Sequence, residues 1–184
     1  MPAPDNYIKP NDINIVDIII RSKLNKYRDG FSLLNSNLVT QLHLYEDLFS
    51  PCLKGELLLL DGANFIGHFP IIGQEELEIT FKTPAVTDQF ITHTFYIYGT
   101  SERAHSQEGP QFEGYTLKFA SPDYINNSHI KCSKSYNGTT SKIISNIMKD
   151  YFPDSKINIQ DTKNNIRFIS PYWSPFRLSL IHIS

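Results

Sequence analysis

The chain has 184 residues, enough for one full domain or for a small domain and part of a second. Apolar residues make up 40% and charged residues 20%, which is ordinary for a soluble globular protein, and the net charge is −2. Because Lys and Arg are scattered singly, the sequence lacks the clustered basic face that direct DNA binding requires.

The N-terminal end and the cysteines indicate a cytoplasmic, soluble product. Residues 1–11 contain three prolines and few apolar side chains, which predicts an extended or mobile arm. No signal peptide and no apolar run of membrane-spanning length is found. Cys52 and Cys132 lie far apart without metal-ligand spacing, so we expect reduced structural thiols.

The first hundred residues predict short strands. The β-branched segment Ile13 to Ile20 predicts a strand whose phase slips at Val16, which indicates a bulge or burial on both faces. Other strand-like or apolar segments, separated by turn signals, are 38–45, 53–60, 65–72 (which leads into the next), 73–84 and 90–98. With no convincing helix among them, these segments indicate an antiparallel barrel or sandwich.

The strictest two-residue period lies between Gly73 and Pro84. Apolar side chains there alternate with polar ones, namely Leu77, Ile79 and Phe81 against Glu76, Glu78, Thr80 and Lys82. Because successive strand side chains point to opposite faces, this strand has one dry and one polar face. We expect the other strands to pack around it.

After the polar stretch 101–111, which contains Gly109-Pro110, the sequence pattern changes from strands alone to strands mixed with helices. We therefore predict a first domain over residues 1–104 and a second from residue 105. The second opens with a strand at Tyr115 to Phe119 and a short helix near Asp123 to Asn127, started by Ser121-Pro122.

The clearest helix carries an apolar stripe at spacings of one, three and four: Ile143, Ile144, Ile147, Met148, Tyr151 and Phe152. Residues 139–141 can cap its start and Pro153 ends it. Residues 157–159 and 166–169 then predict a hairpin. The fold class is β-rich α+β, an N-terminal antiparallel β-barrel followed by a mixed α/β part.

No residue is predicted to be catalytic, to bind a cofactor or to ligate a metal. The six histidines lack metal-ligand spacing with other ligands, and no phosphate loop, HExxH, GxSxG or GxGxxG motif occurs. Glu75, Glu76 and Glu78 resemble a cluster of paired carboxylates. Glu76 and Glu78, however, are expected to project side by side from one exposed strand face, where both stay ionised and their pKa values are not driven apart. The loop run 101–105 places a serine near a histidine, yet adjacency in sequence does not make a triad.

Two other functions are weighed against a structural role. A carbohydrate-binding or adhesin-type module is suggested by aromatic side chains, although core packing is their commoner use. These aromatics are Tyr115, Phe119, Tyr124, Tyr136, Tyr172, Trp173 and Phe176. A lysozyme-like, wall-degrading hydrolase would depend on the three glutamates.

Several segments in order resemble the baseplate hub protein of contractile phage tails, a family related to the spike proteins of type VI secretion. The segments are EELEITFKTP at 75–84, FYIY at 95–98 with SER at 101–103, YTLKFAS at 115–121, SKSY at 133–136 and ISPYWSPF at 169–176. The resemblance extends over residues 11 to 177.

This resemblance implies a tail-tube-type β-barrel up to residue 104 and the start of a mixed α/β domain from 105 to 177. It implies a non-catalytic homotrimer in the virion tail baseplate, a hub joining the tail tube or tube-adaptor proteins to the central spike. DNA would pass through the lumen without specific binding. Our hypothesis is that Glu76, Glu78 and Thr80 face that lumen or a neighbouring subunit, where negative charge repels phosphate.

The chain departs from the family at its end. Family members are much longer and carry a second tube-like barrel. Residues 178–184, LSLIHIS, resemble a translated sequencing-adapter remnant. We therefore expect residues 178–184 to be a non-native tail and the sequence to be a fragment.

Overall fold

The computed structural model describes residues 12–22, 28–47, 50, 52–73, 75–105 and 112–180, without the side chains of residues 88, 102–105 and 180. The expected N-terminal arm, residues 1–11, lies outside this part. The chain forms two compact units. The first contains residues up to 45 and 53–121, and the second contains residues 46–52 and those from 122 onward.

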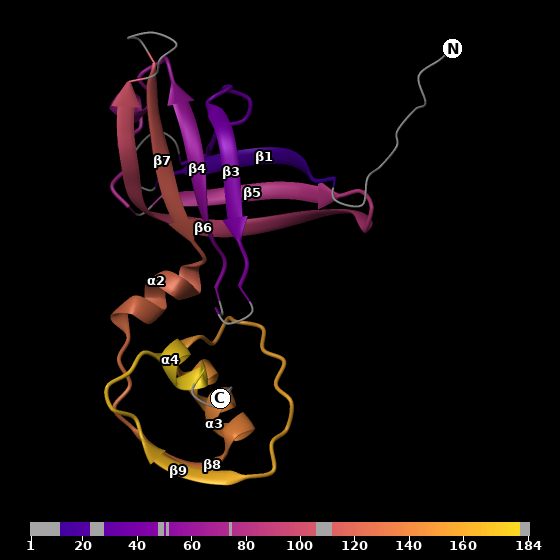
Figure 1. Cartoon of the computed structure of the whole chain (residues 1–184), viewed down its shortest axis with the longest axis vertical. Helices are drawn as coiled ribbons and strands as arrows, with labels where there is room; N and C mark the ends of the chain where they lie inside the picture. The colour runs from indigo at the N-terminus through magenta and orange to yellow at the C-terminus, as the bar shows by residue number, and fades with distance from the viewer. Residues whose placement is uncertain are drawn as a thin grey trace. The chain divides into compact units, whose positions relative to one another are not determined.

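The first unit is one antiparallel sheet of seven strands in the order β2-β1-β5-β6-β7-β4-β3 (Figure 1). Its strands are β1 (Asn14–Arg21), β2 (Phe31–Ser32), β3 (Val39–Tyr45), β4 (Lys54–Asp61), β5 (Glu76–Thr83), β6 (Thr87–His105) and β7 (Glu113–Ala120). Strands β3, β4 and β7 lie across β1, β5 and β6, because the long β6 belongs to both halves of the sheet.

The local predictions for these strands agree with the structure. The phase slip predicted at Val16 is confirmed, since the register of β1 against β5 shifts between Ile15 and Asp17. Strand β5 lies between β1 and β6 and buries Leu77 and Ile79. Burial of each such side chain contributes about 1.5–3 kcal/mol relative to exposure.

The core of the first unit takes residues from both halves of the sheet. Fully buried members include Ile18, Leu57, Phe95 and Phe119. The short helix α1 (Phe65–His68) adds Phe65, where the sequence predicts only a segment leading into β5. The sheet curls, and the edge strands β2 and β3 do not pair with each other. This is a half-barrel among the described residues.

Strand β7 corrects the domain boundary predicted at 104/105. It pairs with β6 on one side and with β4 on the other, so it lies inside the first sheet. The first unit therefore extends to Ser121. Residues 101–105 of the polar stretch belong to strand β6, which pairs with β7 as far as His105 opposite Glu113. A polar composition alone therefore does not identify a domain boundary.

The second unit combines helices with a two-stranded sheet. Its helices are α2 (Pro122–His129), α3 (Thr140–Tyr151) and α4 (Pro175–Leu180), and its strands are β8 (Ser135–Thr139) and β9 (Asn165–Ile169). The predicted start of α2 at Pro122 and the end of α3 before Pro153 are confirmed. The apolar stripe of α3 buries Ile143 and Ile147 against a core that includes Cys132 and Tyr136.

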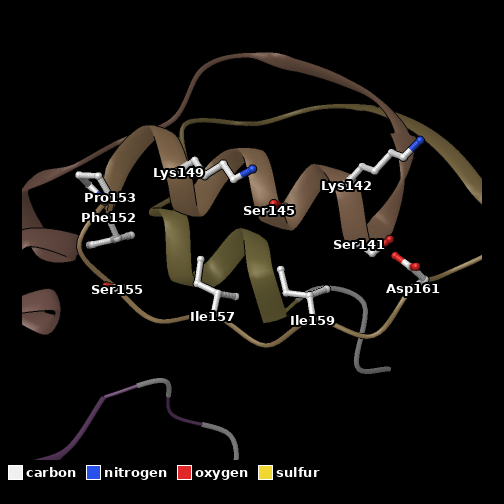
Figure 2. Close-up of a pocket in the computed structure, with 10 residues that line it drawn as sticks. All are labelled: Ser141, Lys142, Ser145, Lys149, Phe152, Pro153, Ser155, Ile157, Ile159 and Asp161. Carbon is white, nitrogen blue, oxygen red and sulfur yellow. The ribbon is translucent and has the colours of Figure 1, made fainter.

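The hairpin predicted between 157–159 and 166–169 is wrong. Strand β9 pairs instead with β8, through Tyr136 opposite Phe168. Residues 156–164 form no helix or strand, and the segment from Pro153 to Asp161 runs back along α3 (Figure 2). Alternating isoleucines predict an extended chain correctly, but they do not identify its pairing partner.

Candidate functional site

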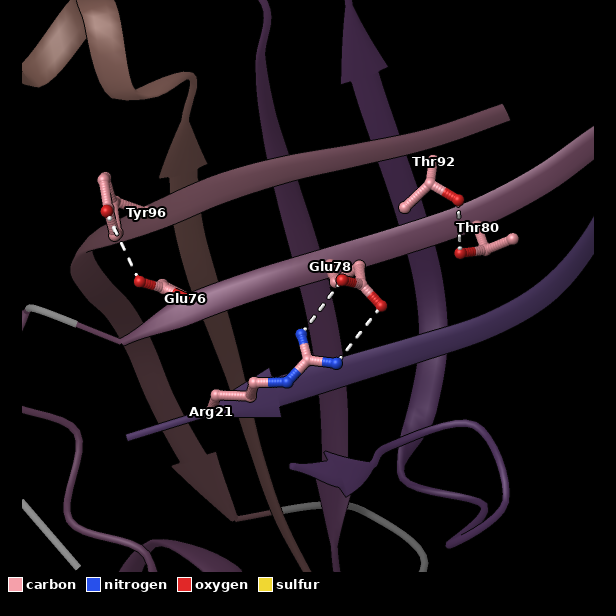
Figure 3. A network of polar contacts seen from close by, with 6 residues as sticks. All are labelled: Arg21, Glu76, Glu78, Thr80, Thr92 and Tyr96. Carbon is pink, nitrogen blue, oxygen red and sulfur yellow. Dashed lines mark hydrogen bonds and ion pairs between the residues drawn. The ribbon is translucent and has the colours of Figure 1, made fainter. Parts of the chain in front are cut away.

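The polar face of β5 carries the residues singled out from the sequence. Glu76, Glu78 and Thr80 all project from the side opposite Leu77 and Ile79 and are half-buried (Figure 3). Tyr96 Oη donates a hydrogen bond of 3.4 Å to Glu76 Oε1, and the hydroxyls of Thr80 and Thr92 lie 3.0 Å apart. The structure thus gathers the three predicted residues on one face.

Arg21 neutralises one of the two carboxylates on this face. Its guanidinium donates two hydrogen bonds to Glu78, of 3.0 Å to Oε2 and 3.3 Å to Oε1 (Figure 3). The side chains are 30% and 27% exposed, so water screens this ion pair only in part. The face is therefore less acidic than the sequence of β5 alone indicates.

Glu75 points away from this face. Its side chain is 1% exposed and accepts hydrogen bonds of 3.0 Å from the backbone N–H groups of Ile72 and Gly73. Gly73 has a φ of 91°, a conformation that favours glycine, so the carboxylate holds a tight turn before β5. Glu75 and Glu76 consequently do not form a pair of catalytic carboxylates.

Sequence reasoning did not identify Arg21, Thr92 and Tyr96 as members of this face. Tyr96 pairs directly with Glu76 across β5 and β6, and Thr92 pairs with Thr80. Arg21 comes from β1, 57 residues before Glu78. The alternation in β5 shows which side chains share a face, but the neighbouring strands are known only once the register is known.

A groove of about 440 Å³ lies in the second unit between α3 and residues 152–161 (Figure 2). Ser145, Lys142 and Lys149 of α3 line one side, and Ile157 and Ile159 line the other. These three residues of α3 lie outside the apolar stripe that the sequence predicts for this helix.

Two tyrosines and a cysteine interact in the core of the second unit, where Tyr136 and Cys132 are buried and Tyr151 is partly buried. Burial, with smaller effects of Cys132, Tyr151 and Asp150, raises the pKa of Tyr136 from 10.0 to about 12. A hydrogen bond with the Cys132 thiol, followed by burial, raises the pKa of Tyr151. No hydrogen-bond partner of Tyr136 Oη is found among the described residues. Cys52 and Cys132 are both buried, free thiols.

Most of the aromatics considered for carbohydrate binding are core residues. Tyr115, Phe119, Tyr136 and Phe176 are at most 6% exposed, so a sugar cannot reach their faces. Tyr172 is 68% exposed. The structure therefore assembles no aromatic platform from these four side chains.

The described ranges contain no group of three or more His, Cys, Asp or Glu side chains arranged to hold a metal ion. Within the same ranges, no helix is long and apolar enough to span a membrane. The side chains of residues 102–105, considered above beside Ser101, lie outside the described part.

No family model matches the sequence, and no curated protein matches it. Solved structures do match. The chain is similar to the tail protein from Neisseria meningitidis, with a TM-score of 0.52 and 10% identity, over 89% of this chain and 43% of that protein.

Two further structures have lower TM-scores. One is the E. coli c3393 protein, described as a type VI secretion component with structural similarity to tail proteins of phage T4. It matches with a TM-score of 0.47 and 11% identity, over 92% of this chain and 39% of that one. A chain of the Francisella PdpA–VgrG complex matches with a TM-score of 0.48 and 16% identity. The match covers 92% of this chain and 24% of that one.

The resemblance to tail proteins is thus confirmed at the level of the fold. The chain spans less than half the length of each of these structures. At 10% identity the shared fold with the Neisseria tail protein does not transfer that protein's partners to this chain.

Proposed function

We propose that this chain is a structural, non-catalytic component of a contractile-tail baseplate, a central hub that joins the tail tube to the cell-puncturing spike. The fold shared with the tail protein from Neisseria meningitidis over 89% of the chain is the observation that carries this proposal. The segments quoted from the sequence support the same family independently of the structure.

The geometry of the sheet is consistent with an assembly role. Its polar side chains on β5 are engaged with neighbouring strands, as Glu78 is with Arg21, and Glu75 holds a turn. A hydrolytic pair would need two carboxylates whose environments separate their pKa values. An assembly surface needs only a rigid, patterned sheet.

In the proposed hub, three copies form a ring and the Glu76, Glu78 and Thr80 face lines the lumen or contacts a neighbouring subunit. DNA passes this face without specific binding. A structure of the assembled ring tests the orientation, and side chains of these three residues on the outer, solvent-facing wall would overturn it.

The hub role is tested on purified particles. Cross-linking followed by mass spectrometry should join peptides of this chain to a tail-tube or tube-adaptor protein and to the central spike protein. Mass photometry of the isolated chain tests the separate proposal of a trimer. Absence of the chain from the particles, or cross-links to head proteins alone, would contradict the hub.

A further inference from the structure

Charge is distributed unevenly along the chain. Residues 1–121 contain nine Lys and Arg against fifteen Asp and Glu, a net charge of −6. Residues 122–184 contain eight Lys and Arg against four Asp and Glu, a net charge of +4. The second unit also contains Glu46 and Asp47, so it has eight Lys and Arg against six Asp and Glu, a net charge of +2, and its basic residues all lie in residues 122–184. Such asymmetry along the chain points to an acidic partner for residues 122–184.

Two of these positive charges flank the groove beside α3. Lys142 and Lys149 are seven positions apart, or about 10 Å along a helix at 1.5 Å per residue. Neither side chain makes an ion pair within the described ranges, whereas Lys134 lies 3.0 Å from Asp150. The carboxylate that lines the groove is Asp161, near the N-terminal end of α3 (Figure 2).

The opposite wall of the groove is an extended segment with free backbone groups. No backbone hydrogen bond joins residues 156–161 to any other described residue, and the next residue, Thr162, donates from its N–H to Ser141 Oγ at 3.2 Å. Ile157 and Ile159 point toward α3 (Figure 2). Unpaired backbone N–H and C=O groups are also what the edge of a sheet offers when an extended peptide adds to it as a further strand.

We propose that this groove binds an extended, acidic peptide segment of a partner protein. The peptide pairs with the backbone of residues 156–160 and directs carboxylates at alternate positions toward Lys142 and Lys149. A nucleic acid is disfavoured because the aromatic ring in the groove, Phe152, is 3% exposed and stacks on Phe176. A small anion would leave the apolar wall and the backbone groups unused.

The binding is tested with the full chain and a fluorescent ten-residue peptide of alternating Glu and Thr. Anisotropy should show saturable binding that weakens as salt is added, because the lysines are exposed. The peptide with Gln in place of Glu should bind much more weakly. Peptides N-methylated at alternate residues should lose binding when the blocked N–H groups face residues 156–160 and retain it when the opposite edge is blocked.

Matched variants locate the site. Lys149→Glu should weaken binding by about three- to tenfold, in the range of an exposed ion pair replaced by repulsion. Lys131→Glu makes the same charge change at an exposed position outside the groove and should leave binding within twofold. Unchanged fluorescence of Trp173 and circular dichroism confirm that both variants are folded.

Several results would overturn the proposal. Equal losses in the two lysine variants would show non-directional attraction to a basic unit. Equal binding of the Glu and Gln peptides would remove the acidic requirement, and insensitivity to N-methylation would remove strand pairing. Complete displacement by millimolar inorganic phosphate would indicate an anion site, and tighter binding of a single-stranded oligonucleotide would indicate a nucleic-acid site.

Discussion

At the scale of single residues, the Arg21–Glu78 pair decides how acidic the β5 face is. Its two hydrogen bonds of 3.0 and 3.3 Å fix the guanidinium between β1 and β5. A half-buried ion pair of this type stabilises a fold modestly, because desolvation offsets much of the attraction.

A double-mutant cycle with Arg21→Ala and Glu78→Ala should give a coupling free energy of about 0.5–1 kcal/mol. Urea unfolding followed by far-ultraviolet circular dichroism measures it. The same cycle with Arg21→Ala and Thr80→Ala is the control and should show almost no coupling, because Thr80 bonds to Thr92 instead. Equal coupling in both cycles would refute a specific pair.

The raised pKa of Tyr136 predicts that the folded chain loses stability at high pH. This pKa is about 12 in the folded state against 10.0 as the ordinary value. Below pH 10 both states are protonated. As the pH rises from 10 toward 12, the unfolded state loses the proton and the folded state keeps it, so unfolding becomes more favourable.

The variant Tyr136→Phe should reduce this loss. Its urea midpoint, followed by the fluorescence of Trp173, should fall less between pH 9 and pH 11 than that of the parent chain. At pH 7 the variant should be about as stable as the parent or slightly more stable, because a buried hydroxyl without a partner is removed. Identical pH profiles would exclude Tyr136 as the source.

At the scale of elements, the close approach of β3, β4 and β7 depends on Gly55. A Cβ atom at this position would collide with the ring of Phe119 and the carbonyl oxygen of His43. Phe119 is fully buried and cannot move aside without displacing the core. Glycine is therefore required by packing at this point, not by backbone conformation.

Gly55→Ala should destabilise the sheet by about 1–3 kcal/mol through overpacking, measured by denaturant unfolding. Gly99→Ala is the matched control, because no atom lies within 4 Å of a Cβ added there. The control should stay within about 0.5 kcal/mol of the parent. If Gly99→Ala lowers the free energy of unfolding as much as Gly55→Ala does, the glycines are required for their backbone conformation and not for packing.

At the scale of the whole molecule, the charge distribution predicts the response to DNA. The net charge of −6 over residues 1–121 repels phosphate, and the +4 of residues 122–184 attracts it weakly. We therefore expect the chain to attract DNA only weakly and without specificity.

A labelled DNA duplex should therefore show weak binding at low salt and no saturable binding at about 150 mM salt, measured by anisotropy. A lysozyme preparation of equal concentration, which is basic, serves as a positive control for non-specific attraction. Saturable binding of the duplex at the higher salt would contradict the proposal that DNA passes the hub without specific binding.

The sequence by itself determined what depends on nearby residues. Alternation placed Glu76, Glu78 and Thr80 on one face of β5, and helical spacing placed Ile143 and Ile147 on the buried side of α3. These periods are local, because a side chain's direction follows from its position in the strand or helix.

Only the tertiary structure decided which segments pair. It placed Arg21 beside Glu78, buried Glu75 against the turn at Ile72 and Gly73, and put β7 inside the first sheet. It also left residues 156–161 without a backbone hydrogen bond to any other described residue. Pairing joins residues far apart in sequence through register and loop closure, and neither is encoded in the period of one segment. The β5 face was therefore predictable, whereas its ion pair and the groove beside α3 were not.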